Sequence, residues 1–110
     1  MFIRVPLIQS TLNLLHQASR ADFGMDRKVL KKVLSGLSDR NLRFRDLLKL
    51  LNAFRFSERV KGNHHIFFRD GVEEIINLQP LRDGKAKAYQ VKQVRNIIIK
   101  YKLHEDDRDV

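Results

Sequence analysis

Two adjacent histidines, His64 and His65, stand in the stretch KGNHHIFFRDG, which spans residues 61–71. Imidazole can donate or accept a proton near neutral pH, because its ordinary pKa is about 6.5. A proton-transfer group surrounded by positive charge suits chemistry on an anionic substrate. Three cationic side chains flank the pair in the sequence: Arg59, Lys61 and Arg69.

An RNA phosphodiester needs few protein groups for its cleavage, because its own 2′-OH supplies the nucleophile. A protein that cleaves RNA therefore needs an acid or base at the phosphate and cations that offset the developing negative charge. His64 or His65 could serve as the first, and the flanking cations as the second. The alternative is that the two histidines merely begin a β-strand, since a histidine in a strand is structural more often than catalytic.

A metal site is less favoured than either interpretation. Adjacent residues in a strand point to opposite faces, so His64 and His65 rarely bind one ion, and no third ligand has suitable spacing in the sequence. We therefore expect neither a metal nor a cofactor. The chain contains no cysteine, which removes disulfides, zinc–thiolate sites and thiol catalysis from consideration.

The charge distribution indicates a polyanionic partner, since the chain has a formal net charge of +9. Residues 25–103 contain 19 Lys and Arg against 8 Asp and Glu, a net charge of +11, whereas residues 104–110 contain one against four, a net charge of −3. A basic surface attracts nucleic acid, because binding releases counterions, and it attracts acidic proteins by the same field. In the basic loop over residues 81–88, Lys85 and Lys87 are further candidates for phosphate contacts, although solvation is the more common role of such a loop.

The length of 110 residues favours a single domain. Residues 1–24 are less basic than the rest, and Pro6 and several polar residues interrupt their apolar stretch, so no membrane span is expected there. A helical pattern begins at Met25. We therefore predict an N-terminal extension over 1–24, either a loosely attached helix or an upstream translated segment. A functional domain over 25–103 and a fraying acidic tail over 104–110 follow.

Hydrophobic periodicity predicts an α+β fold, a three-stranded antiparallel sheet with helices on one face and the other face free for function. The dipeptide Asp70-Gly71 predicts a two-residue hairpin of type I′, in which both residues have positive φ. The predicted order is a helix from an N-cap at Asp26 to a stop at Gly36, a helix over 44–54, strands over 56–60, 64–69 and 72–79, and a helix over 89–102.

Six segments in this order resemble the HicA family of toxins from type II toxin–antitoxin modules. The resemblance covers residues 40–103 well, 25–39 loosely and 1–24 not at all. It implies a double-stranded-RNA-binding-domain-like fold of order α-β-β-β-α, activity as an mRNA interferase and neutralisation by a HicB antitoxin. The segments are the helix FRDLLKLLNAFRF, the strand ending in ERVKGNHHIF, the RDG turn, the strand end INLQP, the lead-in GKAKAYQV and the final helix VRNIIIKYKL.

The resemblance implies that His64 is catalytic, because family members have a catalytic histidine on the second strand after a Gly-Ser or Gly-Gly pair. The matching motif is Lys61-Gly62-Asn63-His64. Three positions depart from the family pattern: Asn63 replaces Ser or Gly, Arg82 replaces the His of Pro-x-His, and Ala88 replaces the Pro of Lys-Pro-Gly-Thr. The residues expected to contact RNA are Arg59, Lys61, Gly62, Asn63, Arg69, Lys85 and Lys87.

Strand parity makes His65 the second choice for the catalytic residue. His64 shares one face with Ile66 and Phe68, and His65 shares the other with Phe67. If Ile66 and Phe68 belong to the core, His64 must lie at the end of the strand, where the sheet opens. Parity alone favours His65, whereas the resemblance favours His64. Either phenylalanine could stack on a base, but at least one is expected in the core.

We therefore expect a toxin that cleaves mRNA in the cytoplasm by metal-free general acid/base catalysis, without membrane attachment. An acidic HicB-type antitoxin is its expected partner. The alternative is a non-catalytic RNA-binding module with the same fold.

Overall fold

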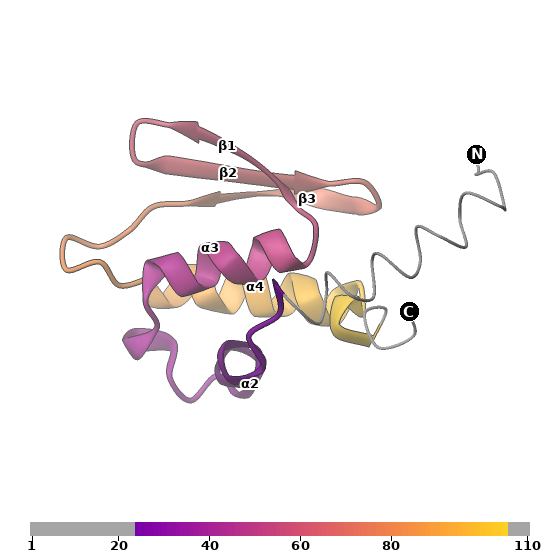
Figure 1. Ribbon diagram of the computed structural model, residues 1–110, viewed down its shortest axis with the longest axis horizontal. Coiled ribbons are helices and arrows are strands. Elements are labelled where there is room, and N and C mark those ends of the chain that lie inside the picture. The colour runs from indigo at the N-terminus through magenta and orange to yellow at the C-terminus, as the bar shows by residue number, and fades with distance from the viewer. Residues whose placement is uncertain (1–23, 106–110) are drawn as a thin grey trace, which may run out of the picture.

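A three-stranded antiparallel sheet and a set of helices form the α+β fold of the computed structural model, which describes residues 24–105 (Figure 1). The predicted helices and strands are present, and their bounds differ from the predicted ones by no more than two residues. The predicted extension up to residue 23 and the tail from residue 106 lie outside the described residues. No helix of the described part is long and apolar enough to span a membrane. In chain order the elements are α2 (Arg27–Ser35), the 3-10 helix η2 (Asp39–Asn41), α3 (Phe44–Ala53), β1 (Ser57–Lys61), β2 (His64–Arg69), β3 (Val72–Leu78) and α4 (Ala88–Lys100).

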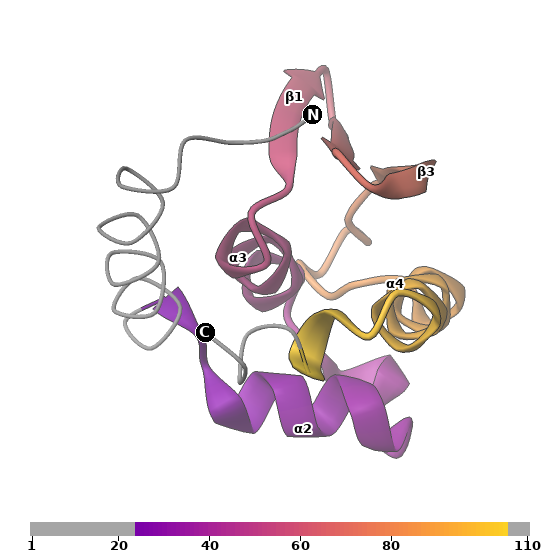
Figure 2. The same cartoon turned by 90° about the vertical axis from the view of Figure 1, so that its right-hand side faces the viewer.

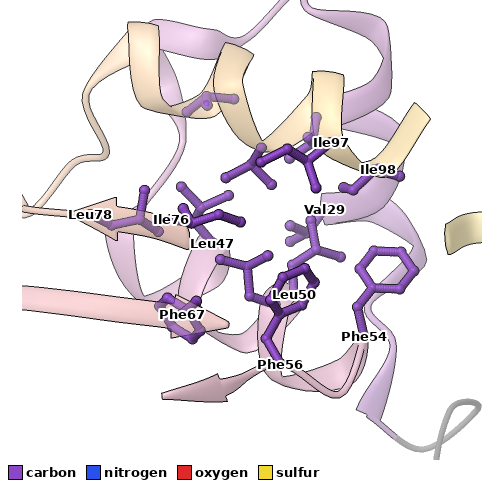
Figure 3. Packing of buried hydrophobic residues seen from close by; sticks show 14 of the residues in the cluster. Val29, Leu47, Leu50, Phe54, Phe56, Phe67, Ile76, Leu78, Ile97 and Ile98 are labelled. Atoms are coloured by element: carbon purple, nitrogen blue, oxygen red, sulfur yellow. The ribbon is translucent and has the colours of Figure 1, made fainter. Parts of the chain in front are cut away.

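Among residues 24–105, the helices cover one face of the sheet, and no helix lies on the other, which we call the open face (Figures 1 and 2). Helices α3 and α4 lie next to the sheet, and α2 lies on their far side. Phe67 of β2 and Ile76 of β3 point toward the helices and are fully buried, with 0% of their surface exposed. Figure 3 shows them in one cluster with Leu50 of α3 and Ile98 of α4. Burial of this apolar surface is the main force that holds the sheet on the helices.

The alternation along β2 settles which aromatic ring belongs to the core. Phe67 is buried, whereas Phe68 is 44% exposed and Ile66 is half-buried on the open face. The condition that Ile66 and Phe68 form part of the core is therefore wrong. Both faces of this strand contain large apolar residues, so its sequence alone does not reveal which face the helices cover.

The hairpin between β2 and β3 is confirmed, but its predicted turn type is wrong. Arg69 pairs with Val72 across Asp70 and Gly71. Gly71 has a φ of 86°, whereas Asp70 does not adopt a positive φ, as a type I′ turn would require. Glycine enters the left-handed region without the steric cost that a Cβ imposes, so the turn uses it at that position alone.

Helix α2 begins and ends at the predicted signals. One carboxylate oxygen of Asp26 accepts the backbone N–H groups of Lys28, at 3.0 Å, and of Val29, at 3.2 Å, as an N-cap does. Gly36 ends the helix with a φ of 73°. Met25, just before the cap, is only 8% exposed and belongs to the apolar cluster. The packed core therefore includes the residue at which the domain is predicted to begin.

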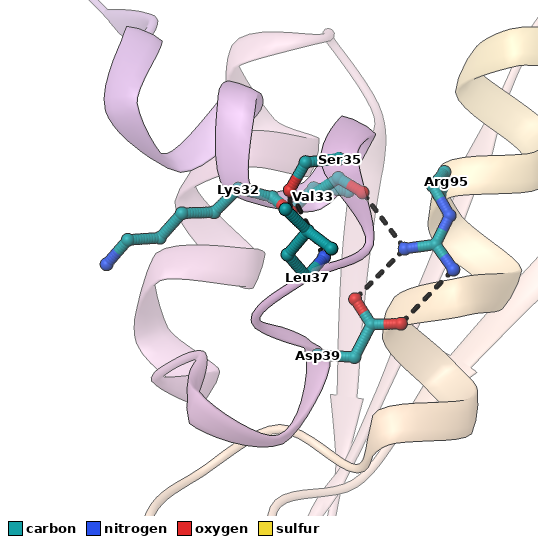
Figure 4. Close-up of polar contacts among 6 residues, drawn as sticks. All are labelled: Lys32, Val33, Ser35, Leu37, Asp39 and Arg95. Atoms are coloured by element: carbon teal, nitrogen blue, oxygen red, sulfur yellow. Dashed lines mark hydrogen bonds and ion pairs between the residues drawn. The ribbon is translucent and has the colours of Figure 1, made fainter.

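Arg95 of α4 joins that helix to the end of α2 (Figure 4). Its Nη1 donates to the carbonyl oxygen of Val33 at 3.0 Å, and Nη1 and Nη2 donate to the two carboxylate oxygens of Asp39 at 2.9 and 3.1 Å. The side chains of Arg95 and Asp39 are only 15% and 19% exposed. A bidentate guanidinium–carboxylate pair is stronger and more directional than an ordinary hydrogen bond. It fixes how α2, η2 and α4 lie against one another.

The far end of α4 contacts β3 through a second polar cluster. Nζ of Lys100 lies 2.7 Å from one carboxylate oxygen of Glu74, and the hydroxyl of Tyr101 donates to the other at 2.6 Å. These hydrogen bonds, from Lys100 first and then Tyr101, lower the pKa of Glu74 to about 2. The same hydroxyl accepts the backbone N–H of Glu73 at 3.2 Å. Helix α4 is thus held to β3 at its C-terminal end.

Candidate functional site

The two histidines lie at the start of β2 and belong to opposite faces of the sheet. His65 belongs to the helix-covered face, where its ring meets Phe44 of α3 edge-on with 5.1 Å between the centroids. Its Nδ1 lies 2.7 Å from the carboxylate of Glu58. His64 belongs to the open face and is exposed. The structure therefore gives His65 packing contacts and leaves His64 accessible to a substrate.

Asn77 of β3 orients the imidazole of His64. Nδ1 of His64 lies 3.1 Å from Oδ1 of Asn77. An amide oxygen only accepts hydrogen bonds, so Nδ1 holds the hydrogen and Nε2 is the basic nitrogen of the neutral ring. Nε2 has no hydrogen-bond partner among residues 24–105. The ring is therefore held through one nitrogen while the other remains available for proton transfer.

Two of the predicted cations share the open face with His64. Lys61 is the direct cross-strand partner of His64, and Arg59 is the partner of Ile66, so the side chains of these residues alternate onto the same face. Both cations are exposed. Between Lys61 and His64 the turn contains Gly62, with a φ of 62°, and Asn63. The structure thus brings together, at this end of the sheet, four of the predicted RNA contacts.

A pocket of about 300 Å³ opens beside His64, between β3 and the start of α4. We call it the amide pocket, after its Asn and Gln side chains. Lys87, another predicted RNA contact, lies at its border, because its Nζ donates to Oε1 of Gln79 at 3.3 Å. The residues that line the amide pocket are His64, Ile75, Asn77, Gln79, Tyr89, Gln90 and Gln93.

The remaining two predicted RNA contacts lie elsewhere. Arg69 is at the opposite end of β2 on the helix-covered face, and its guanidinium donates to the carbonyl oxygen of Phe54 at 2.9 Å. Arg69 therefore binds the end of α3 and is not placed to bind a phosphate near His64. Nζ of Lys85 donates to Oδ1 of Asn41 at 3.2 Å, in the loop beside η2. Neither side chain lines the amide pocket.

Gln90 is the buried residue of the amide pocket, and its side chain bonds to the backbone along the edge of β3. It is only 5% exposed. Its side-chain oxygen accepts the backbone N–H of Gln79 at 3.1 Å, and its nitrogen donates to the backbone oxygen of Asn77 at 3.3 Å. The amide thus bonds to β3 much as a neighbouring strand would. Because Asn77 in turn holds His64, α4 and the catalytic candidate are connected through one strand edge.

Sequence reasoning missed Asn77, Gln79, Tyr89, Gln90 and Gln93. The alternation of INLQ does indicate that Asn77 and Gln79 share one face, since Ile76 and Leu78 are apolar. The contact between Asn77 and His64 depends on the register of β2 against β3. The bonds of Gln90 to Asn77 and Gln79 depend on how α4 packs against β3. Neither relationship has a local signal in the sequence.

Comparisons of the chain with protein-family models, with curated proteins and with solved structures find no match. Within residues 24–105, no three His, Cys, Asp or Glu side chains come together as metal ligands would.

Proposed function

We propose that this chain is an endoribonuclease similar to the HicA toxins, with a double-stranded-RNA-binding-domain-like fold and with His64 as its general acid/base. One arrangement supports the proposal above all others. An exposed imidazole has its Nδ1 engaged by Asn77 and its Nε2 accessible, on the same sheet face as Lys61 and Arg59. His65, in contact with Phe44 and Glu58, is less suited to the role.

In the proposed reaction, Nε2 of His64 removes the proton from a 2′-OH of RNA. The 2′-oxygen attacks the adjacent phosphorus, and the bond from phosphorus to the 5′-oxygen breaks. The imidazolium then returns the proton to the departing 5′-oxygen, which leaves a 2′,3′-cyclic phosphate and a 5′-hydroxyl. Lys61 and Arg59 stabilise the negative charge that accumulates at the phosphorus centre.

The proposed substrate is mRNA in the cytoplasm, and the proposed protein partner is an acidic antitoxin of the HicB type. The net charge of +11 over residues 25–103 supports both. Such an antitoxin would neutralise the enzyme by covering the open face around His64. Electrostatic attraction of this kind speeds association and is screened by salt. The association rate should therefore fall as salt is raised, and a rate independent of salt would contradict this partner.

A non-catalytic RNA-binding module of the same fold is the second candidate, and one observation favours it. Phe68 is 44% exposed on the open face, which Arg59 shares. An exposed aromatic ring beside a cation can stack on a base and hold the neighbouring phosphate without any cleavage.

Purified protein incubated with total RNA in the presence of EDTA separates these candidates. Cleavage into fragments with 2′,3′-cyclic phosphate ends supports the enzyme. Binding of RNA without cleavage supports the second candidate. Replacement of the attacking 2′-OH by hydrogen should abolish cleavage and preserve binding, because the nucleophile is then absent.

A further inference from the structure

Apart from His64 and Asn77, the residues that line the amide pocket have no role in the proton transfer or in the phosphate contacts proposed above. Its size and its lining nevertheless suit one part of an RNA molecule. We propose that the amide pocket binds an unpaired nucleobase, that of a nucleotide next to the phosphate at His64. This inference rests on the proposed function only in taking His64 as the position of that phosphate.

The polar lining matches the edge of a base. Oδ1 of Asn77 is occupied by His64, and Oε1 of Gln79 is occupied by Lys87, so the NH₂ groups of both amides remain as donors. The side chain of Gln93 has no hydrogen-bond partner among the described residues. Donors thus outnumber acceptors in the pocket. Uracil, cytosine and guanine, which present carbonyl oxygens, should bind better than adenine, which accepts only through ring nitrogens and adds an NH₂ donor on the edge that would face the amide donors.

The apolar lining matches the face of a base. Tyr89 is 66% exposed. Its hydroxyl accepts a hydrogen bond from Nε2 of Gln90 at 3.3 Å, which holds the ring beside the pocket. Ile75 adds an exposed apolar surface from β3. Aromatic rings bind bases by stacking, and the stacked base must be unpaired for its edge to reach the amides.

The charges also fit a neutral ligand attached to an anion. The pocket lining contains no carboxylate, and His64 is its one histidine. Lys87 lies at the border and Lys61 beside His64 on the neighbouring strand. A nucleotide would therefore place its uncharged base among the amides and its phosphate among the cations.

The experiment is an NMR titration of isotope-labelled protein with each of the four nucleoside 3′-monophosphates and with ribose 5-phosphate. The nucleotides with carbonyl-bearing bases should shift the side-chain amide signals of Gln79 and Gln93, and adenosine monophosphate should bind several-fold more weakly. Ribose 5-phosphate, which lacks a base, should leave those amide signals in place. Equal shifts from ribose 5-phosphate and from the nucleotides would overturn the inference.

Variants sharpen the test. Tyr89→Ala should weaken nucleotide binding about tenfold. Tyr89→Phe, which retains the ring and loses only the hydrogen bond from Gln90, should weaken it much less. Asn96→Ala is the matched control for Gln93→Ala, because both side chains are exposed on α4 but Asn96 does not line the pocket. Equal losses of nucleotide affinity in Gln93→Ala and Asn96→Ala would contradict a role for Gln93.

Cleavage assays keep this inference separate from the proposed function. Nucleotide binding in the pocket without RNA cleavage would support the pocket and contradict the enzyme. Cleavage whose sequence preference is unchanged in Tyr89→Ala and Gln93→Ala would support the enzyme and contradict the pocket.

Discussion

Nδ1 of His65 lies 2.7 Å from a carboxylate oxygen of Glu58, on the face of the sheet that the helices cover. Only about a fifth of either side chain is exposed, 21% for His65 and 23% for Glu58. The same imidazole packs edge-on against Phe44. His65 therefore connects β1 and β2 to α3, while its neighbour His64 remains exposed on the open face.

Alanine substitutions at the two histidines should affect different properties, the cleavage rate at His64 and the stability at His65. His64→Ala should lower the cleavage rate about 10²–10⁴-fold, the usual contribution of a general acid/base, and leave the melting temperature unchanged. His65→Ala should lower the free energy of unfolding by about 1–3 kcal/mol, because it removes a partner from Glu58, and the folded fraction should still cleave. Cleavage rates and thermal melts of both variants check this. Full activity in His64→Ala together with loss in a folded His65→Ala would reverse the assignment.

Asn77 should act on catalysis through the orientation of His64. Asn77→Leu should lower kcat by about a hundredfold with little change in KM, since the misplacement of a catalytic group by about 1 Å can cost that much. Asn77→Asp retains an acceptor for Nδ1 and should retain more of the activity. Single-turnover and steady-state kinetics measure both. Equal losses in the two variants would show that the acceptor oxygen is not what Asn77 contributes.

Substitution of Gly36 by alanine should destabilise the fold, in part because the new side chain would crowd Arg95. Gly36 has a φ of 73°, and a Cβ there would lie 3.2 Å from the guanidinium of Arg95. Gly71 has a φ of 86°, and no atom of the described part of the chain lies within 4 Å of its Cβ position. Alanine at either glycine costs about 1–2 kcal/mol for the left-handed backbone. Gly36→Ala should cost more than this. In an Arg95→Ala background this additional cost should disappear. Urea unfolding of Gly36→Ala and Gly71→Ala, each with and without Arg95→Ala, measures it. An excess that survives would exclude the guanidinium as its cause.

Acid should remove the stabilising effect of Glu74. Its pKa is lowered from 4.5 to about 2, so the contribution to stability is complete above pH 4.5 and is lost as the pH falls toward 2. The pKa of Lys100 is raised by the same contact, so its contribution is lost only above its ordinary value of 10.5. Glu74→Gln should flatten the dependence of the urea midpoint on pH between 4.5 and 2. Glu73→Gln, whose side chain is exposed and outside the cluster, is the control. Similar slopes in the two variants would contradict the role of Glu74.

The domain should fold from Met25 onward. Met25 packs in the apolar cluster and comes just before Asp26, which provides the cap of α2. A chain that begins at Met25 should therefore unfold at the same temperature as the full chain and should cleave RNA equally well. Thermal melts of the two proteins decide the point. A midpoint several degrees lower in the shorter chain would show that residues 1–24 belong to the domain.

Local signals in the sequence predicted the elements of the fold but not how they meet. Asp26 and Gly36 mark the ends of α2, and Gly71 marks the last hairpin, because caps and turns depend on a few adjacent residues. The covered face of β2 was not predictable, since Phe67 and Phe68 are equally apolar. Only the packing of α3 and α4 distinguishes them.

The candidate site was predicted in part for the same reason. His64 and Lys61 lie on either side of one tight turn, so their proximity follows from the hairpin. Arg69 is close to His64 in the sequence, yet it faces the helices at the other end of the strand. Gln90 is 26 positions after His64 and reaches its surroundings only because α4 packs beside β3. Contacts between distant segments are set by tertiary packing.

The contacts between α4 and β3 also decide how the sheet could grow. The backbone N–H of Glu73, the backbone oxygen of Asn77 and the backbone N–H of Gln79 are occupied by Tyr101 and Gln90. An added strand at this edge would have to displace these bonds, whereas β1 is the other edge of the sheet and has no such side-chain bonds to its backbone among the described residues. A sheet with one receptive edge can join a second sheet once and then stops, so two copies could pair through β1 without propagating into a fibre.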